Sequence, residues 1–131
     1  MRLLLLGCTG FVGKELVPTL INNNHKIYIV SRKPISKLKL DIDFKKFQFL
    51  QIDLSKEKSW NNDNLLNIIR ETDGIINLMG EPIAEKKWTS AQKQEIENSR
   101  INTTKFMMKT LKNLKINPKV IINGSAIGYY G

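Results

Sequence analysis

The sequence predicts a doubly wound α/β fold, a three-layer sandwich in which helices cover both faces of a parallel sheet with strand order 3-2-1-4-5. Short apolar runs alternate with segments of helical periodicity along the chain, as expected of parallel strands joined by right-handed crossovers. The first run, residues 2–6, is nearly all apolar and closes on glycine, which favours a strand buried on both faces. No repeat or linker divides the 131 residues, so we expect one domain over residues 1–131.

The first half of the chain is expected to contain three strands and one helix. Residues 2–6 form the first strand, and residues 11–21 place apolar side chains at helical spacing. Pro18 lies inside this helix and should bend it, because proline removes a backbone donor. β-branched and aromatic residues then predict strands over residues 26–30 and 47–52. Between these two strands the lysine-rich sequence has no clear pattern.

The second half adds two helices and two strands. Apolar side chains at helical spacing predict a helix over residues 63–71, which is followed by an apolar strand over residues 75–79. The capping box of residues 89–92 opens a long helix, which stops before the Asn-Pro pair at residues 117–118. Residues 120–123 are β-branched and form the fifth strand.

Composition narrows the class of protein. The formal net charge is +9, but four of the lysines recur at the three- and four-residue spacing of one solvated helix face: Lys105, Lys109, Lys112 and Lys115. No nucleic-acid motif accompanies the charge, so we expect no nucleic-acid partner. The single cysteine, Cys8, excludes an intramolecular disulfide and fits a reducing compartment. No apolar run is long enough for a secretion signal or a membrane span, so we expect a cytoplasmic protein that binds no membrane.

The first strand runs into the glycine-rich segment GCTGFVG, residues 7–13, and then into a helix. Gly7 permits a tight turn, and Gly10 lets the backbone approach a pyrophosphate. Gly13 lets the helix pack on the strand, with phosphate charge at the amino end of the helix. In this strand-turn-helix context the glycines predict a dinucleotide-binding domain of the Rossmann type. A purely structural glycine turn is the alternative.

The segment SRKP, residues 31–34, follows the second strand. Domains that bind NAD usually place a carboxylate here to hold the ribose 2′-hydroxyl, whereas an arginine accommodates the 2′-phosphate of NADP. Because the segment has no acid, Arg32, together with Ser31 and Lys33, predicts NADP as the cofactor in preference to NAD. A solvated charge cluster is the alternative.

Four segments together resemble the extended short-chain dehydrogenase/reductase superfamily: TGFVG, INLMGEPI, KKWTSAQKQEIENSRINTTK and GSAIGYYG. More narrowly, they resemble its atypical, NAD(P)-dependent epimerase-like branch, some members of which are labelled homologues of the cell-division inhibitor SulA. The resemblance covers the chain from end to end. It implies the dinucleotide-binding part of an epimerase, dehydratase or reductase.

The resemblance also implies which positions hold the cofactor. Asp53 and Leu54 match the pair that meets the adenine ring, and Leu78, Met79 and Gly80 match the segment that lines the cofactor's ribose. The pyrophosphate loop matches six residues near the amino terminus: Gly7, Thr9, Gly10, Phe11, Val12 and Gly13.

Two further positions match catalytic residues of the superfamily. Asn102 matches the helix asparagine, and Ser125 matches the active-site serine, which hydrogen-bonds the reacting substrate oxygen. An ordinary turn serine is the alternative for Ser125. Tyr129 and Tyr130 do not match the acid/base tyrosine, which belongs to a Y-x-x-x-K motif whose lysine lowers the phenol pKa.

We therefore expect a chain truncated after the fifth strand, without a substrate domain and not catalytically complete alone. A non-catalytic dinucleotide-binding regulatory module, related to cell division, is the alternative. The fifth strand would form an exposed sheet edge, and such edges recruit partners. This predicts a homodimer through the edge strand or an aggregation-prone monomer.

Overall fold

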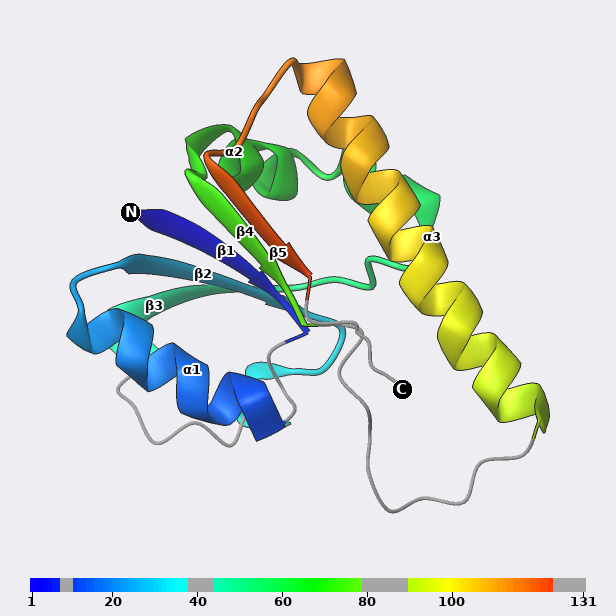
Figure 1. Cartoon of the computed structure of the whole chain (residues 1–131), viewed down its shortest axis with the longest axis horizontal. Coiled ribbons are helices and arrows are strands. Elements are labelled where there is room, and N and C mark those ends of the chain that lie inside the picture. The colour runs from blue at the N-terminus through cyan, green and yellow to red at the C-terminus, as the bar shows by residue number, and fades with distance from the viewer. Residues whose placement is uncertain (8–10, 38–43, 79–89, 124–131) are drawn as a thin grey trace.

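Five parallel strands form a single sheet in the order β3-β2-β1-β4-β5 (Figure 1). The computed structural model describes residues 1–7, 11–37, 44–78 and 90–123. The strands are β1 (Arg2–Leu6), β2 (Lys26–Ser31), β3 (Phe47–Gln51), β4 (Gly74–Asn77) and β5 (Val120–Asn123). The predicted fold class and strand order are confirmed.

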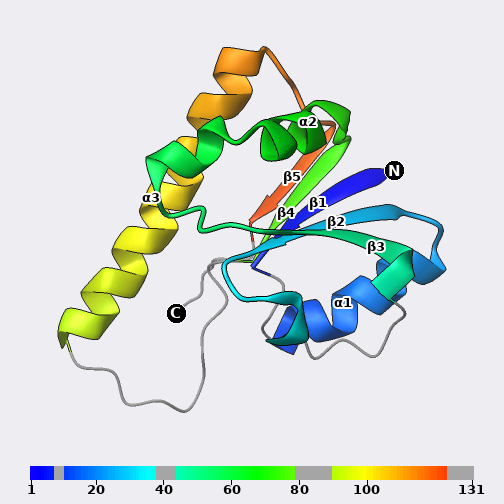
Figure 2. The ribbon, with the colours of Figure 1, turned by 180° about the vertical axis from the view of Figure 1, so that it is seen from behind.

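Helices cover both faces of this sheet, which gives three layers. The α-helices of the described residues are α1 (Phe11–Asn22), α2 (Asp63–Glu71) and α3 (Ser90–Leu114). Figures 1 and 2 show α1 on one face and α2 with α3 on the other. Short 3-10 helices complete the described elements: η1 (Ile35–Lys37), η2 (Phe44–Lys46) and η3 (Glu57–Asn61).

The leucines of β1 alternate between two cores. Leu4 and Leu6 pack on the α2 and α3 side, in a cluster that includes Tyr28 and Met107. The odd-numbered leucines pack on the α1 side, with Val17 and other apolar residues. Side chains of a strand point alternately to opposite faces. An all-apolar strand is therefore what a sheet covered on both faces requires.

Asp73 joins three strands at the amino edge of the sheet. Its Oδ2 accepts the Arg2 backbone N–H at 2.8 Å, and its own N–H donates to the Arg2 carbonyl at 2.8 Å. The Asp73 carbonyl accepts the Lys119 N–H at 2.7 Å, just before β5. The hydrogen bond from Arg2 holds the pKa of the Asp73 carboxyl below its ordinary value, with help from the charges of Lys119, Arg2 and the amino terminus.

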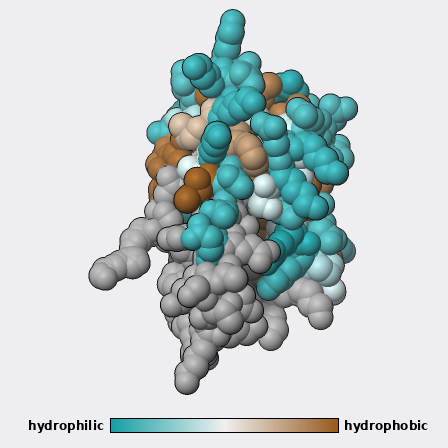
Figure 3. All heavy atoms as spheres, turned by 90° about the vertical axis from the view of Figure 1, so that its right-hand side faces the viewer, coloured by the Kyte–Doolittle hydropathy of each residue, from teal (hydrophilic) through white to brown (hydrophobic). Residues whose placement is uncertain are grey.

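On the side of the molecule where α3 lies, most of the coloured surface is hydrophilic (Figure 3). Lys105, Lys109 and Lys112 are exposed, as the sequence pattern predicts. Lys109 Nζ lies 3.1 Å from Glu57 Oε2, so this helix face is partly neutralised by η3. Within the described ranges, no helix combines the length and the apolar character needed to cross a membrane.

Candidate cofactor site at the carboxyl edge of the sheet

The carboxyl ends of the five strands meet along one edge of the sheet. Leu6 at the end of β1 is in register with Val30 of β2 and with Asn77 of β4. Val30 is in turn in register with Leu50 of β3, and Asn77 with Asn123 of β5. Residues that directly follow the strands are therefore brought together. In open α/β sheets this is the edge at which ligands bind.

Gly7 forms the turn out of β1. Its φ of 72° lies in the left-handed region, which glycine adopts without strain, and its N–H donates to the Val30 carbonyl at 3.4 Å. Phe11, Val12 and Gly13 form the first turn of α1, which contains no acidic residue. An amino-terminal turn free of acids suits a bound phosphate. The predicted positions Thr9 and Gly10 lie outside the described residues.

Arg32 follows β2 at this edge. Its carbonyl accepts the Gln51 Nε2–H at 3.2 Å, while its side chain is exposed. Ser31 is 8% exposed, and its Oγ accepts the Lys33 N–H at 3.1 Å. The Ser31 carbonyl accepts the N–H of Ile52, after β3, at 2.8 Å. Hydrogen bonds therefore fix the main chain of the segment that is predicted to bind the 2′-phosphate, and the side chain of Arg32 is exposed.

Asp53, just past β3, is held as an ionised acceptor. Its Oδ1 accepts the Ser55 N–H at 3.0 Å and the Ser55 Oγ–H at 2.7 Å. Burial, the largest single influence, acts to raise the pKa of the carboxyl. The hydrogen bonds from Ser55 and the charges of Arg32 and Lys56 outweigh burial, so the pKa lies below its ordinary value. The charge of Arg32 thus acts on Asp53 across the ends of two neighbouring strands.

Leu54 is anchored by a tryptophan that the sequence patterns did not indicate. Leu54 is 3% exposed, and its carbonyl accepts the Trp60 Nε1–H at 2.9 Å. Trp60 is 4% exposed and lies in η3. The Asp-x-Ser spacing of Asp53 and Ser55 is a known turn signal that could have identified Ser55, whereas nothing in the sequence relates Trp60 or Gln51 to the site.

At the end of β4, Leu78 is 5% exposed and its N–H donates to the Leu6 carbonyl at 2.8 Å. This hydrogen bond places Leu78 at the same edge as Gly7 and Arg32. Two positions expected beside it, Met79 and Gly80, and the predicted catalytic Ser125 lie outside the described residues.

Asn102, the second predicted catalytic residue, lies on α3 and is exposed. The residue after it, Thr103, is fully buried instead. Asn77 Nδ2 donates to Thr104 Oγ1 at 3.5 Å, which joins α3 to the end of β4. The catalytic role of Asn102 stays a prediction.

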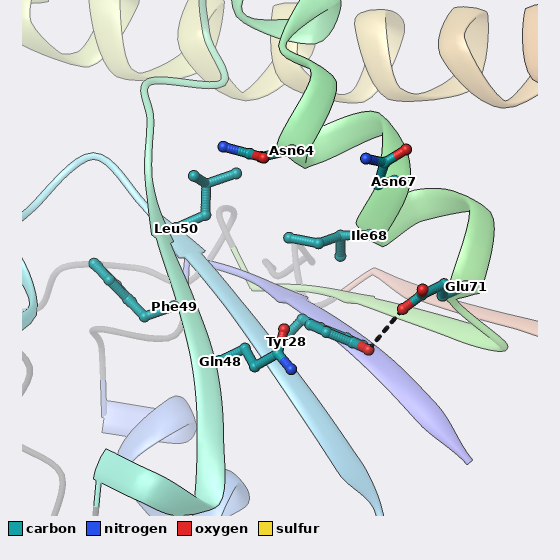
Figure 4. A pocket seen from close by; sticks show the side chains of 8 residues that line it. All are labelled: Tyr28, Gln48, Phe49, Leu50, Asn64, Asn67, Ile68 and Glu71. Atoms are coloured by element: carbon teal, nitrogen blue, oxygen red, sulfur yellow. Dashed lines mark hydrogen bonds between the residues drawn. The ribbon is translucent and has the colours of Figure 1, made fainter.

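A separate cavity of about 350 Å³ lies between β3 and α2 (Figure 4). Figure 4 shows Leu50 and Ile68 on opposite sides of the space, with the Tyr28 O–H donating to Glu71 Oε2 at 3.0 Å. None of its lining residues is a predicted cofactor position: Tyr28, Gln48, Phe49, Leu50, Asn64, Asn67, Ile68 and Glu71. Over the described ranges, no group of three or more His, Cys, Asp or Glu side chains could hold a metal ion.

Residues 3–131 match the family model described as the NAD dependent epimerase/dehydratase family. The chain is 32% identical over 133 residues to an epimerase family protein of Arabidopsis thaliana, a chloroplastic SDR39U1 homolog, covering 100% of this chain and 36% of that protein. It is 31% identical to the epimerase family protein YfhF of Bacillus subtilis, covering 100% of this chain and 39% of that protein. The chain thus spans little more than a third of the length of these curated relatives.

Solved structures share the fold. UDP-glucose 4-epimerase of Thermotoga maritima, solved with UDP-glucose, has a TM-score of 0.69 at 16% identity, over 99% of this chain and 42% of that one. ElxO with NADP bound has a TM-score of 0.66 at 21% identity, over 93% of this chain and 54% of that one. A short chain dehydrogenase of Leptospira borgpetersenii with bound NAD+ has a TM-score of 0.68 at 18% identity, over 93% and 50% of the two chains. These likenesses show the fold alone. Because the family model matches residues 3–131, the chain belongs to the NAD dependent epimerase/dehydratase family.

Proposed function

We propose that residues 1–131 form the NADP-binding domain of an epimerase-, dehydratase- or reductase-like protein. The observation that carries this proposal is the exposed Arg32 at the end of β2, fixed through its main chain on the same sheet edge as the Gly7 turn. A guanidinium is suited to a phosphate monoester, because its N–H groups can form two parallel hydrogen bonds to phosphate oxygens. An acid at this position would instead favour the free 2′-hydroxyl of NAD.

The other strand ends would hold the rest of the dinucleotide. The Gly7 turn and the first turn of α1 would bind the pyrophosphate through backbone N–H groups. The Asp53 carboxylate, whose pKa is lowered, is an acceptor for the exocyclic amino group of adenine. Leu54 would supply an apolar contact beside the ring, and Leu78 would line the ribose.

The substrate chemistry belongs to a longer protein in this proposal. A nicotinamide cofactor accepts or supplies hydride, and Ser125 would orient the reacting oxygen of the substrate. The acid/base group and the substrate pocket would come from sequence that the relatives have beyond the third of their length matched here. A cytoplasmic location is part of the same proposal and rests on the single cysteine. The regulatory, division-related alternative gains no support from relatives that are named as epimerase family proteins.

A second copy of the chain, paired along β5, is the proposed protein partner. Among the described strands β5 lies at the edge of the sheet, and Ile122 on it is 50% exposed. Sedimentation at increasing concentration should show a dimer. A monodisperse monomer at high concentration would contradict this part of the proposal.

Calorimetric titration with NADPH and NADH tests the cofactor assignment. The wild-type chain should bind NADPH with micromolar affinity, about 8 kcal/mol, and more tightly than NADH. Arg32→Ala should weaken NADPH binding roughly tenfold or more, because a hydrogen bond to a charged group is lost, and leave NADH binding unchanged. Lys58→Ala, which removes an exposed lysine in η3, is the control for non-specific charge. Equal affinity for both cofactors, unaltered by Arg32→Ala, would contradict the assignment.

A further inference from the structure

Arg32 lies immediately beyond the last paired residues of β2 and β3. Ser31 and Gln51 form the last pair in register between these strands. Arg32 and Lys33 then leave the sheet, and both are exposed. Pro34 follows and has no backbone donor. Within the described part of the chain, side chains provide the hydrogen bonds that hold the main chain at Arg32 beyond the last strand pair.

Two side chains supply that support. Gln51 Nε2–H donates to the Arg32 carbonyl at 3.2 Å, reaching one residue past its own partner on the neighbouring strand. Ser31 Oγ accepts the Lys33 N–H at 3.1 Å. One hydrogen bond thus lies on each side of the Arg32 peptide group. They fix the backbone of Arg32 and leave its guanidinium exposed.

We propose that Gln51 is a positioning residue that gives this domain its preference for a dinucleotide with a 2′-phosphate, acting through Arg32. This inference rests on the proposed function. Paired hydrogen bonds from a guanidinium to a phosphate require the arginine to approach in one orientation. A backbone that is already fixed loses less conformational entropy when the phosphate binds. The 2′-hydroxyl of NAD does not require paired hydrogen bonds from an oriented guanidinium, so the effect of Gln51 is specific to NADP.

The test compares two substitutions of Gln51 with a matched control on the same strand. Gln51→Ala removes the donor to the Arg32 carbonyl. Gln51→Glu also removes it, and adds a negative charge near the phosphate position. Gln48→Ala removes the same type of exposed side chain from β3, three residues away from Gln51. Thermal unfolding of each variant checks that the fold is retained.

Calorimetric titration with NADPH and NADH should separate the variants. Gln51→Ala should weaken NADPH binding about three- to tenfold, the effect of one hydrogen bond, and change NADH binding less than about twofold. Gln51→Glu should weaken NADPH binding at least as much, and Gln48→Ala should alter neither affinity. If wild type prefers NADPH but Gln51→Ala keeps that preference or weakens both cofactors equally, the role of Gln51 is overturned and the proposed function stands. If wild type fails to bind NADPH, both are overturned.

Discussion

Trp60→Phe should destabilise the protein and loosen the segment that follows β3. Trp60 is 4% exposed, and its Nε1–H donates to the Leu54 carbonyl at 2.9 Å. It packs in the core on the α2 and α3 side, with Leu65 and Ile69 of α2. Phenylalanine keeps an aromatic ring in this core but leaves the buried carbonyl of Leu54 without its donor.

The expected loss of stability has two parts. An unpaired buried carbonyl costs about 1–3 kcal/mol, and the smaller ring adds roughly 1 kcal/mol of lost packing, as other small reductions of core side chains do. The sum, about 2–4 kcal/mol, is a large fraction of a typical stability of about 5–15 kcal/mol. At this chain length each kcal/mol lowers Tm by about 3–5 °C, so a fall of about 6–20 °C is expected.

Urea unfolding followed by far-UV circular dichroism measures this loss without relying on the tryptophan that is removed. The midpoint should fall while the slope with denaturant stays constant. The folded variant should also bind NADPH more weakly, because Leu54 loses the hydrogen bond from Trp60 and directly follows Asp53, the proposed adenine contact. Ser59→Ala, on the preceding residue of η3, is the control. A free energy of unfolding within about 0.5 kcal/mol of wild type would refute the reasoning.

Three further predictions concern the sheet and α3. Gly74→Ala should lower the free energy of unfolding by about 1–3 kcal/mol, because a Cβ there would lie 2.7 Å from Val120 Cγ1 and 3.0 Å from Leu3 Cδ2. In urea unfolding, adding Val120→Ala should restore part of that loss. If the losses from the two substitutions simply add, the contact is contradicted. Thr103→Val should raise the free energy of unfolding by about 1 kcal/mol, because Thr103 Oγ1 is buried and, among the described residues, has no hydrogen-bond partner. A lower free energy of unfolding in the variant would show that the hydroxyl has a partner. The stability that Asp73 contributes should be present above the ordinary pKa of 3.8 and disappear as pH falls through the lowered pKa of this carboxyl. In thermal unfolding, Asp73→Asn should therefore have a lower Tm than wild type at neutral pH, and its Tm should fall less on acidification. An equal fall in Tm for both proteins would contradict this role of Asp73.

The sequence predicts the sheet well because its signals are local. The apolar strand of residues 2–6, the glycine after it and the alternation of elements predict a doubly wound sheet of the Rossmann type. The observed order β3-β2-β1-β4-β5 is the one that this fold implies. The observed ends of two strands differ by one residue from the predicted ends. β2 includes Ser31 and β3 ends at Gln51, because these two residues form the last pair between the strands. The unpatterned residues 33–46 include two short 3-10 helices, η1 and η2, which are too short to produce a periodic pattern in the sequence.

The sequence predicts a residue of the candidate site only where the residue type alone indicates its role. Gly7 and Arg32 follow from backbone freedom and charge, and the structure places both at the carboxyl edge. Gln51 and Trp60 could not be predicted, because each donates a side-chain hydrogen bond to a main-chain carbonyl on another segment. Such contacts exist only after the strands and η3 are packed. Asn102 follows from a motif match alone, and the structure leaves its side chain exposed.

Residue-resolved NMR during titration with NADPH tests the central claim most directly. The account predicts saturable shifts of the backbone amide signals that follow the strand ends, at Gly7, Arg32 and Leu54, with little change at Gln48 and Asn67 beside the cavity of Figure 4. Shifts confined to that cavity, or no shifts at millimolar NADPH, which corresponds to a binding free energy weaker than about 4 kcal/mol, would contradict it.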